Sequence, residues 1–246
     1  MLLLIVAFLY ASVGHGGASG YLAVLSLLAV GTSQMKTSAL VLNIIVSAIS
    51  FYHFYKEGYF DWKLFWPFAI TSVPMAFLGA TIPVSDALYK QLLGVCLLFA
   101  VARISGLFDY FLKNEKRKTK NERQPSLLIT HYAFIIGALI GLLSGMLGIG
   151  GGIILSPILL LMGWAGMKQT AAVSALFIFV NSIAGLVGLL QKGIEINPEM
   201  YSWIACATVG ALAGGYLGSK KFNFATLKYI LALVLLIASV KLMMVK

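Results

Sequence analysis

The stretch GLLSGMLGIGGGIILSPILLLMG, residues 141–163, decides what kind of protein this chain is. It contains no charged residue, and successive glycines at 150–152 separate an apolar segment before them from an apolar segment after them. Glycines interrupt a helix, because they lack a Cβ and adopt backbone conformations that other residues avoid. We therefore expect apolar helical segments joined by a glycine-rich loop. The later segment, 151–163, is shorter than the about 20 residues of a membrane crossing.

The rest of the chain is also apolar. Hydrophobic residues make up 60% of the 246 residues and charged residues only 11%, whereas soluble domains carry about 25% charged residues. Uncharged spans at 37–55, 64–85, 124–167, 169–191 and 200–219 have the length of membrane crossings. The composition predicts an all-α integral membrane protein. The apolar N-terminal stretch lacks a basic region in front of it, so we expect it to belong to the fold and not to be a signal peptide.

The glycine-rich loop has a degenerate copy near the N-terminus. Gly14-His15-Gly16-Gly17 corresponds to Gly148-Ile149-Gly150-Gly151, and TSALVLN at 37–43 corresponds to VSALFIFVN at 173–181. This ordered recurrence predicts two transmembrane repeats, residues 1–110 and 126–246, of about five helical segments each. The expected segments cover residues 1–13, 18–31, 36–56, 63–83 and 87–109, then 127–147, 151–163, 169–191, 199–219 and 225–245.

A polar linker, residues 111–125, separates the repeats and includes the basic run KNEKRKTKNER at 113–123. Because an odd number of segments precedes the linker, the second repeat should have inverted topology. Placing the linker in the cytoplasm then puts most of the 18 Lys and Arg residues on the cytoplasmic side, as the positive-inside rule requires. We expect a multi-pass protein of the cell (inner or plasma) membrane, with short helices or hairpins flanking the glycine-rich loops.

Several function classes are disfavoured. The net charge of +10 comes from basic residues in short loops without an aromatic-lined basic face, so we expect no nucleic-acid partner. Cys96 and Cys206 lie in apolar runs without metal-ligand spacing, and no Ser/His/Asp grouping has its acid at the same depth. We therefore expect no enzyme, no catalytic residue, no cofactor and no metal. The expected partners are a small anionic substrate and the lipid bilayer, and a homodimer is left open.

The eight acidic residues all fall in loops or at the ends of the expected helices. Cation transporters usually place carboxylates at membrane depth, whereas a carboxylate would repel an anion. Each glycine-rich loop precedes a helix start, where unpaired N–H groups and the helix dipole favour an anion. The two loops together predict an anion site near the membrane midplane, although glycines also simply allow close helix packing.

Polar side chains in the apolar segments complete this prediction, because hydroxyl and amide groups can donate to an oxyanion. The alternative for them is hydrogen bonding between helices. His15 could donate to the anion or carry a proton, and its counterpart Ile149 could do neither. Lys36 and Lys168 could attract an anion or could simply be solvated. The expected substrate-binding residues are Gly14, His15, Gly16, Gly17, Ser19, Ser38, Asn43, Gly148, Gly150, Gly151, Gly152, Ser174 and Asn181.

The two glycine-rich stretches, 141–163 and ASVGHGGASGYLAVLSLLAVG at 11–31, and the SAL motifs resemble the sulfite exporter TauE/SafE family of bacterial and archaeal membrane proteins. The first copy departs from the second at His15 and at Ala23, which stands where the second copy has Pro157. The resemblance implies export or uptake of small sulfur-containing anions such as sulfite, sulfoacetate or other organosulfonates. Alternating access would follow from rocking of the two repeats. The alternatives are a passive anion channel and a membrane scaffold that transports nothing.

Overall fold

The computed structural model describes residues 1–104, 126–191, 193, 197–220, 236–237 and 239–240. Every regular element in these residues is an α-helix, as the composition predicts. The helices that can be bounded are α1 (Leu2–Ser12), α2 (Ala18–Leu27), α3 (Thr32–Lys56), α4 (Trp62–Thr81), α5 (Asp86–Ile104), α7 (Ser126–Leu147), α8 (Gly152–Leu161), α9 (Met167–Leu190) and α10 (Met200–Lys220). The basic run at 113–123 and most of the expected segment 225–245 lie outside the described residues.

The helices fall into two length classes. Within the described residues, α3, α4, α9 and α10 are long and apolar enough to cross a membrane. In contrast, α1 has 11 residues and α2 and α8 have 10 each. At 1.5 Å per residue such helices are about 15 Å long, half of the about 30 Å hydrocarbon core. The expected short helices beside the glycine-rich loops are therefore confirmed for these three, whereas α7 is longer, with 22 residues.

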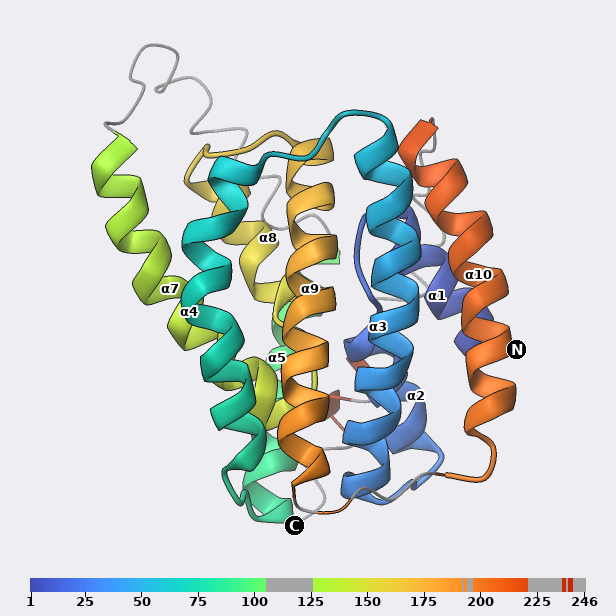
Figure 1. Cartoon of the computed structure of the whole chain (residues 1–246). Coiled ribbons are helices and arrows are strands. Elements are labelled where there is room, and N and C mark those ends of the chain that lie inside the picture. Colours follow the sequence, from blue (N-terminus) through green and yellow to red (C-terminus); the bar gives the residue numbers. More distant parts are fainter. Residues whose placement is uncertain (105–125, 192, 194–196, 221–235, 238, 241–246) are drawn as a thin grey trace.

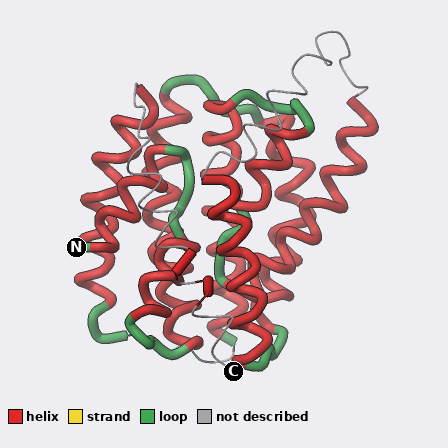
Figure 2. Tube along the Cα trace, turned by 180° about the vertical axis from the view of Figure 1, so that it is seen from behind, coloured by secondary structure: helices red, strands yellow, loops and turns green. Residues whose placement is uncertain are grey.

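The long helices α3 and α9 pack side by side at the centre of the molecule (Figure 1). α4 covers one flank of this pair and packs on α9 and α7, while α10 covers the other flank and packs on α3 and α1. The short helix α2 packs on α3, and α8 packs on α9. Seen from behind, loop segments pass through the interior of the helical bundle, where the short helices end (Figure 2).

The two central helices run antiparallel, since α3 begins at the lower end of the molecule in Figure 1 and α9 begins at the upper end. Side-chain contacts mark both ends. Gln169 at the start of α9 contacts Asp61 at the start of α4, and Gln34 at the start of α3 contacts Asn197 just before α10. This arrangement is what an inverted repeat requires. The duplication itself stays a prediction, because residues 221–235, which would follow α10 as α5 follows α4, are outside the described part.

Both flanks are packed through glycines. A Cβ added to a glycine of α7 would collide with the backbone of α4, and one added to a glycine of α10 would collide with the backbone of α1. Small residues at this spacing let membrane helices approach closely without a hydrophobic driving force. The glycines concerned are Gly137, Gly141 and Gly145 in α7, and Gly210, Gly214 and Gly218 in α10. Close packing therefore holds α7 against α4 and α10 against α1. The short helices α2 and α8 pack on the central helices α3 and α9 instead.

Candidate functional site

The two glycine-rich loops have related backbone shapes. In the first, Gly14 has φ +74° and Gly17 has φ +93°; in the second, Gly148 has φ +74° and Gly151 has φ +76°. These left-handed conformations cost an L-residue about 1–2 kcal/mol, which explains glycine at the matching positions. Each loop thereby reverses the chain inside the bundle and starts a short helix, α2 or α8. The residues 14–20 and 148–153 are all buried.

The two loops meet at the same place on the central helices. A Cβ on Gly16 would lie 2.5 Å from Asn43 Oδ1 and 2.8 Å from Ile178 Cγ2. A Cβ on Gly150 would lie 2.8 Å from Asn43 Nδ2 and 2.8 Å from the same Ile178 atom. The structure therefore brings the expected residues Gly16, Gly150 and Asn43 together between α3 and α9. We call this meeting point the loop junction.

Both loops contain backbone N–H groups without a partner among the described residues. Within the described part of the chain, no acceptor bonds the N–H groups of residues 16–20 or of residues 150–153. Gly17 and Gly151 precede α2 and α8 without a side-chain cap. The first N–H groups of a helix have no partner within the helix, so these two buried and uncapped starts keep donors available to a ligand. Such starts bind anions readily, because their dipoles and N–H groups act together.

Asn43 and Ser182 supply polar side chains at the loop junction, and Asn43 contacts both loops. Its Nδ2 donates a long hydrogen bond of 3.4 Å to Ser182 Oγ, and its buried Oδ1 has no partner among the described residues. Turning the amide over exchanges the donor and the acceptor, and either orientation leaves part of the amide available to a ligand. Ser182 was not among the residues expected from the sequence. The sequence feature that could have indicated Ser182 is its position, one residue after Asn181 in an otherwise apolar helix.

A second group of expected residues is joined by a serine that the sequence analysis missed. His15 is buried with 1% of its surface exposed. Its Nδ1 lies 2.9 Å from the Val13 carbonyl oxygen, and its Nε2 lies 2.7 Å from Ser156 Oγ on α8. Ser156 Oγ lies 2.8 Å from Ser174 Oγ on α9. His15 thus links the first glycine-rich loop to both helices that follow the second one.

Three other expected residues lie in different surroundings. Asn181 is turned toward α4, where its Nδ2 donates to Ser72 Oγ at 3.1 Å, and it also donates to the Phe177 carbonyl at 2.8 Å. Ser19 is bonded to Tyr10 of α1 at 2.5 Å. Ser38 is buried, and its hydroxyl has no partner among the described residues. The structure does not bring Asn181 or Ser19 to the loop junction.

The remaining expected glycines are contact points with the central helices. A Cβ on Gly14 would collide with Ala171 of α9, whereas one on Gly148 would lie 3.4 Å from the backbone of Lys36 of α3. Gly152 abuts Ile178. Lys36 places its Nζ 4.4 Å from the centre of the Tyr89 ring. Lys168 donates to the carbonyl oxygens of Gly218 and Ser219, so its ammonium closes the end of α10 and is not simply solvated.

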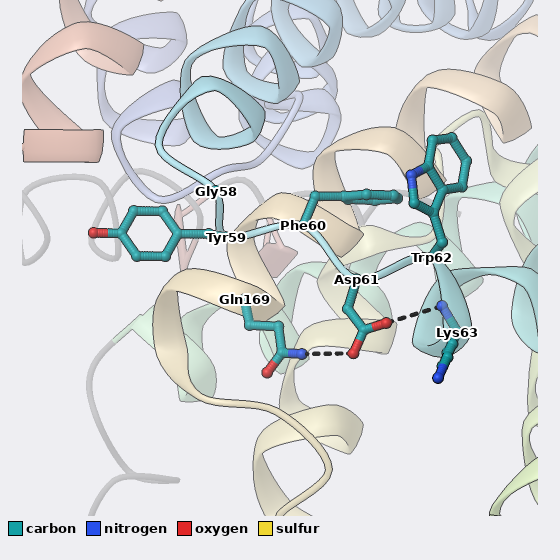
Figure 3. Close-up of a pocket in the computed structure, with 7 residues that line it drawn as sticks. All are labelled: Gly58, Tyr59, Phe60, Asp61, Trp62, Lys63 and Gln169. Carbon is teal, nitrogen blue, oxygen red and sulfur yellow. Dashed lines mark hydrogen bonds between the residues drawn. The ribbon is translucent and has the colours of Figure 1, made fainter.

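A hollow of about 560 Å³ lies apart from these residues, at the end where α4 and α9 begin (Figure 3). Figure 3 shows the Asp61 carboxylate between Gln169 and the backbone of Lys63. Asp61 caps α4 by accepting from Lys63 N at 2.9 Å. The aromatic rings of Phe60 and Trp62 beside it suit the membrane–water interface. The hollow contains none of the expected site residues. Over the described residues, no group of three or more His, Cys, Asp or Glu is placed to hold a metal ion.

Comparison with known proteins identifies the family. Residues 1–242 match the sulfite exporter TauE/SafE family. The chain belongs to this family. A probable membrane transporter protein of Sinorhizobium fredii is 32% identical over 239 residues, which are 97% of this chain and 94% of that protein. No solved structure matches.

Two further relatives carry the same description. A probable membrane transporter protein of Bacillus subtilis is 27% identical and shares 91% of this chain and 90% of its own length. One of Methanocaldococcus jannaschii is 30% identical over 68% of this chain and 57% of its own length. The family and its relatives are described as membrane transporters and not as enzymes. Together with the apolar crossing helices, they identify this TauE/SafE protein as a multi-pass membrane protein.

Proposed function

We propose that this TauE/SafE protein is a secondary transporter that exports small sulfur-containing anions such as sulfite, sulfoacetate and other organosulfonates. The observation that carries the proposal is the loop junction, where Gly16 and Gly150, which lie next to two uncapped helix starts, both contact Asn43. The helices that follow the loops, α2 and α8, carry no charged side chain. Unpaired N–H groups on helices that carry no carboxylate suit the oxygens of a sulfite or sulfonate group.

Alternating access would follow from the way the short helices are held. α2 packs on α3, and α8 packs on α9, so one short helix belongs to each central helix. A small rocking of α3 against α9 would open the junction to one side and then to the other. We place the protein in the cell membrane with its basic linker in the cytoplasm, which the positive-inside rule supports.

Transport by purified protein in proteoliposomes tests the proposal, with sulfite, sulfoacetate and methanesulfonate as substrates. Flux that saturates with concentration and shows counterflow is the expected result. Flux that rises without saturation would instead identify a passive channel. No flux of any of these anions would contradict the proposal, provided that the protein stays folded in the vesicles.

A single methyl group tests the location of the site. Gly16→Ala places its Cβ 2.5 Å from Asn43 Oδ1, at the loop junction, and we expect it to lower flux by about tenfold or more because the methyl group displaces Asn43 at the proposed site. Gly31→Ala is the matched control, since a Cβ there meets nothing within 4 Å. Neither glycine has a positive φ, so the two variants differ in space and not in backbone strain. Equal flux in both variants would show that the substrate does not bind at the loop junction.

A further inference from the structure

We propose that the hollow at the start of α4 binds the headgroup of a phosphatidylethanolamine lipid. The Asp61 carboxylate binds the ammonium group of this lipid, and the Lys63 ammonium binds its phosphate. Both side chains line the hollow (Figure 3). Its volume of about 560 Å³ lies within the range of about 300–1,000 Å³ that is usual for small-molecule sites. The hollow is separate from the loop junction, so this proposal does not depend on the transport function.

The hollow lies at the edge of the membrane. The helix α4 has 20 residues and is one of those that can cross a membrane. At 1.5 Å per residue it is about 30 Å long, which matches the hydrocarbon core, so its first residue lies at the boundary with water. This first residue is Trp62, which lines the hollow. Lipid headgroups occupy this depth, so a lipid reaches the hollow without leaving the membrane.

The side chains of Asp61 and Lys63 give the hollow both signs of charge. Asp61 accepts from the backbone N–H groups of Lys63 and Leu64, at 2.9 Å and 3.4 Å, and its other oxygen accepts from the Gln169 amide at 3.1 Å. These donors are neutral and a carboxylate has about four acceptor positions, so an ammonium can still bind to it. The Lys63 side chain is exposed, and its ammonium suits a phosphate. The pair therefore complements a zwitterionic headgroup, whereas an anionic one would be repelled by Asp61.

Aromatic rings favour a cationic group at the same place. Tyr59, Phe60 and Trp62 line the hollow, and the ring centres of Phe60 and Trp62 lie 4.8 Å apart at an angle of 83°. The faces of such rings attract ammonium groups. A primary ammonium can also donate to the Asp61 carboxylate, whereas a trimethylammonium has no N–H to donate. The rings together with the carboxylate therefore favour ethanolamine over choline.

An exposed apolar row continues from the hollow along α4. Trp62, Trp66 and Ile70 follow each other at intervals of four residues, and all three are exposed. Residues at this spacing are neighbours on a helix surface, and the rings of Trp62 and Trp66 stack with their centres 6.1 Å apart. The row is about 12 Å long, which is most of the about 15 Å of hydrocarbon in one leaflet. A lipid with its headgroup in the hollow can therefore lay an acyl chain along this row.

Lipid binding to the purified and delipidated protein tests the proposal. Native mass spectrometry resolves single bound lipids, so phosphatidylethanolamine, phosphatidylcholine and phosphatidylglycerol with identical acyl chains can be compared. We expect the first phosphatidylethanolamine to bind about tenfold more tightly than either of the others. Equal binding of phosphatidylcholine would show that no N–H of the lipid reaches Asp61. Tighter binding of phosphatidylglycerol would show that the hollow prefers an anionic lipid, and either result would overturn the proposal.

Asp61→Asn shows whether the preference arises in the hollow, because asparagine also caps a helix but carries no charge. We expect this variant to bind phosphatidylethanolamine no more tightly than phosphatidylcholine. Glu57→Gln is the matched control, since Glu57 is an exposed acid just before the hollow and does not line it. This control should keep the tenfold preference. A preference that survives in Asp61→Asn, or that disappears equally in Glu57→Gln, would contradict the role of Asp61.

Lys63→Gln tests the phosphate contact and also covers the case in which Asp61→Asn does not fold, because Lys63 is exposed. We expect it to weaken phosphatidylethanolamine binding by about threefold. Lys56→Gln is its control, since Lys56 is exposed and lies outside the hollow, and it should bind the lipid as the wild-type protein does. Unchanged binding by Lys63→Gln would remove the phosphate contact and overturn the proposed headgroup orientation.

A headgroup without acyl chains distinguishes a lipid from a soluble ligand. Glycerophosphoethanolamine has the same ammonium and phosphate but nothing to place on Trp66 and Ile70. We expect it to displace the lipid only at concentrations about a hundredfold higher, because the burial of several methylene groups is lost. Displacement at concentrations equal to those of the lipid would assign the hollow to a water-soluble ligand and would overturn the proposal.

Discussion

The first and second glycine-rich loops share two left-handed glycines and differ between them, where Gly150 is also left-handed and Gly16 is not. Both reverse the chain with left-handed glycines, at Gly14 and Gly17 in one and at Gly148 and Gly151 in the other. Between these glycines the first loop carries His15, which contacts α8, and the second carries buried Ile149. The left-handed glycine turns are therefore present in both loops, whereas only the first loop has a titratable side chain, His15, between them.

The largest expected effect is a difference in stability between alanine variants of the first glycine of each loop, Gly14 and Gly148. Gly14→Ala combines left-handed strain with a Cβ 2.5 Å from Ala171, so we expect it to lower the unfolding free energy by about 2–5 kcal/mol. Gly148→Ala has the same φ but meets its nearest atom at 3.4 Å, so only the strain of about 1–2 kcal/mol applies. Thermal unfolding in detergent measures both. Equal losses would show that Ala171 moves aside freely.

Much of this architecture could be predicted from the sequence, because it depends on local properties. Apolar length predicts the long helices, and glycine clusters predict where the short helices break. Contacts between residues far apart in the sequence could not be predicted in this way. Ser156 becomes important only because His15 reaches it from 141 positions away, and Asn181 turns to Ser72 because α4 lies beside α9. Aligning Asn43 with Asn181 by motif suggests equal roles, and only the packing separates them.

The second comparison therefore concerns Asn43 and Asn181, one on each central helix. Asn181→Leu breaks hydrogen bonds of 3.1 Å and 2.8 Å in a buried position, and we expect a loss of about 1–3 kcal/mol of stability. Asn43 makes only a 3.4 Å bond, so Asn43→Leu should change stability by less than about 1 kcal/mol. Its sulfonate flux should instead fall by about tenfold or more, since the ligand loses its amide donor. Parallel unfolding and flux measurements separate the two asparagines, and a stable, fully active Asn43→Leu protein would remove Asn43 from the site.

The smallest expected effect on stability concerns the side-chain contacts at the two ends of the α3–α9 pair. Gln169 donates to the Asp61 carboxylate at 3.1 Å, and Asn197 donates to Gln34 at 3.1 Å, so each central helix is tied to the start of a long helix at one end. A bond to a charged acceptor is worth more than a neutral one. We expect Gln169→Ala to cost about 1 kcal/mol and Gln34→Ala about 0.5 kcal/mol, both reduced by partial exposure.

Asp61→Asn would sharpen this last comparison, because it makes the first contact neutral as well. In an Asp61→Asn background, Gln169→Ala should cost no more than Gln34→Ala does, which a double-mutant cycle of unfolding free energies can measure. Asp61 also caps α4 through Lys63 N, so Asp61→Asn alone should be nearly neutral there, since Asn caps a helix as well as Asp does. If Gln169→Ala lowers the unfolding free energy by the same amount in the Asp61→Asn background, then Gln169 stabilises the protein through packing. The Gln169 and Gln34 contacts would then differ in packing and not in charge.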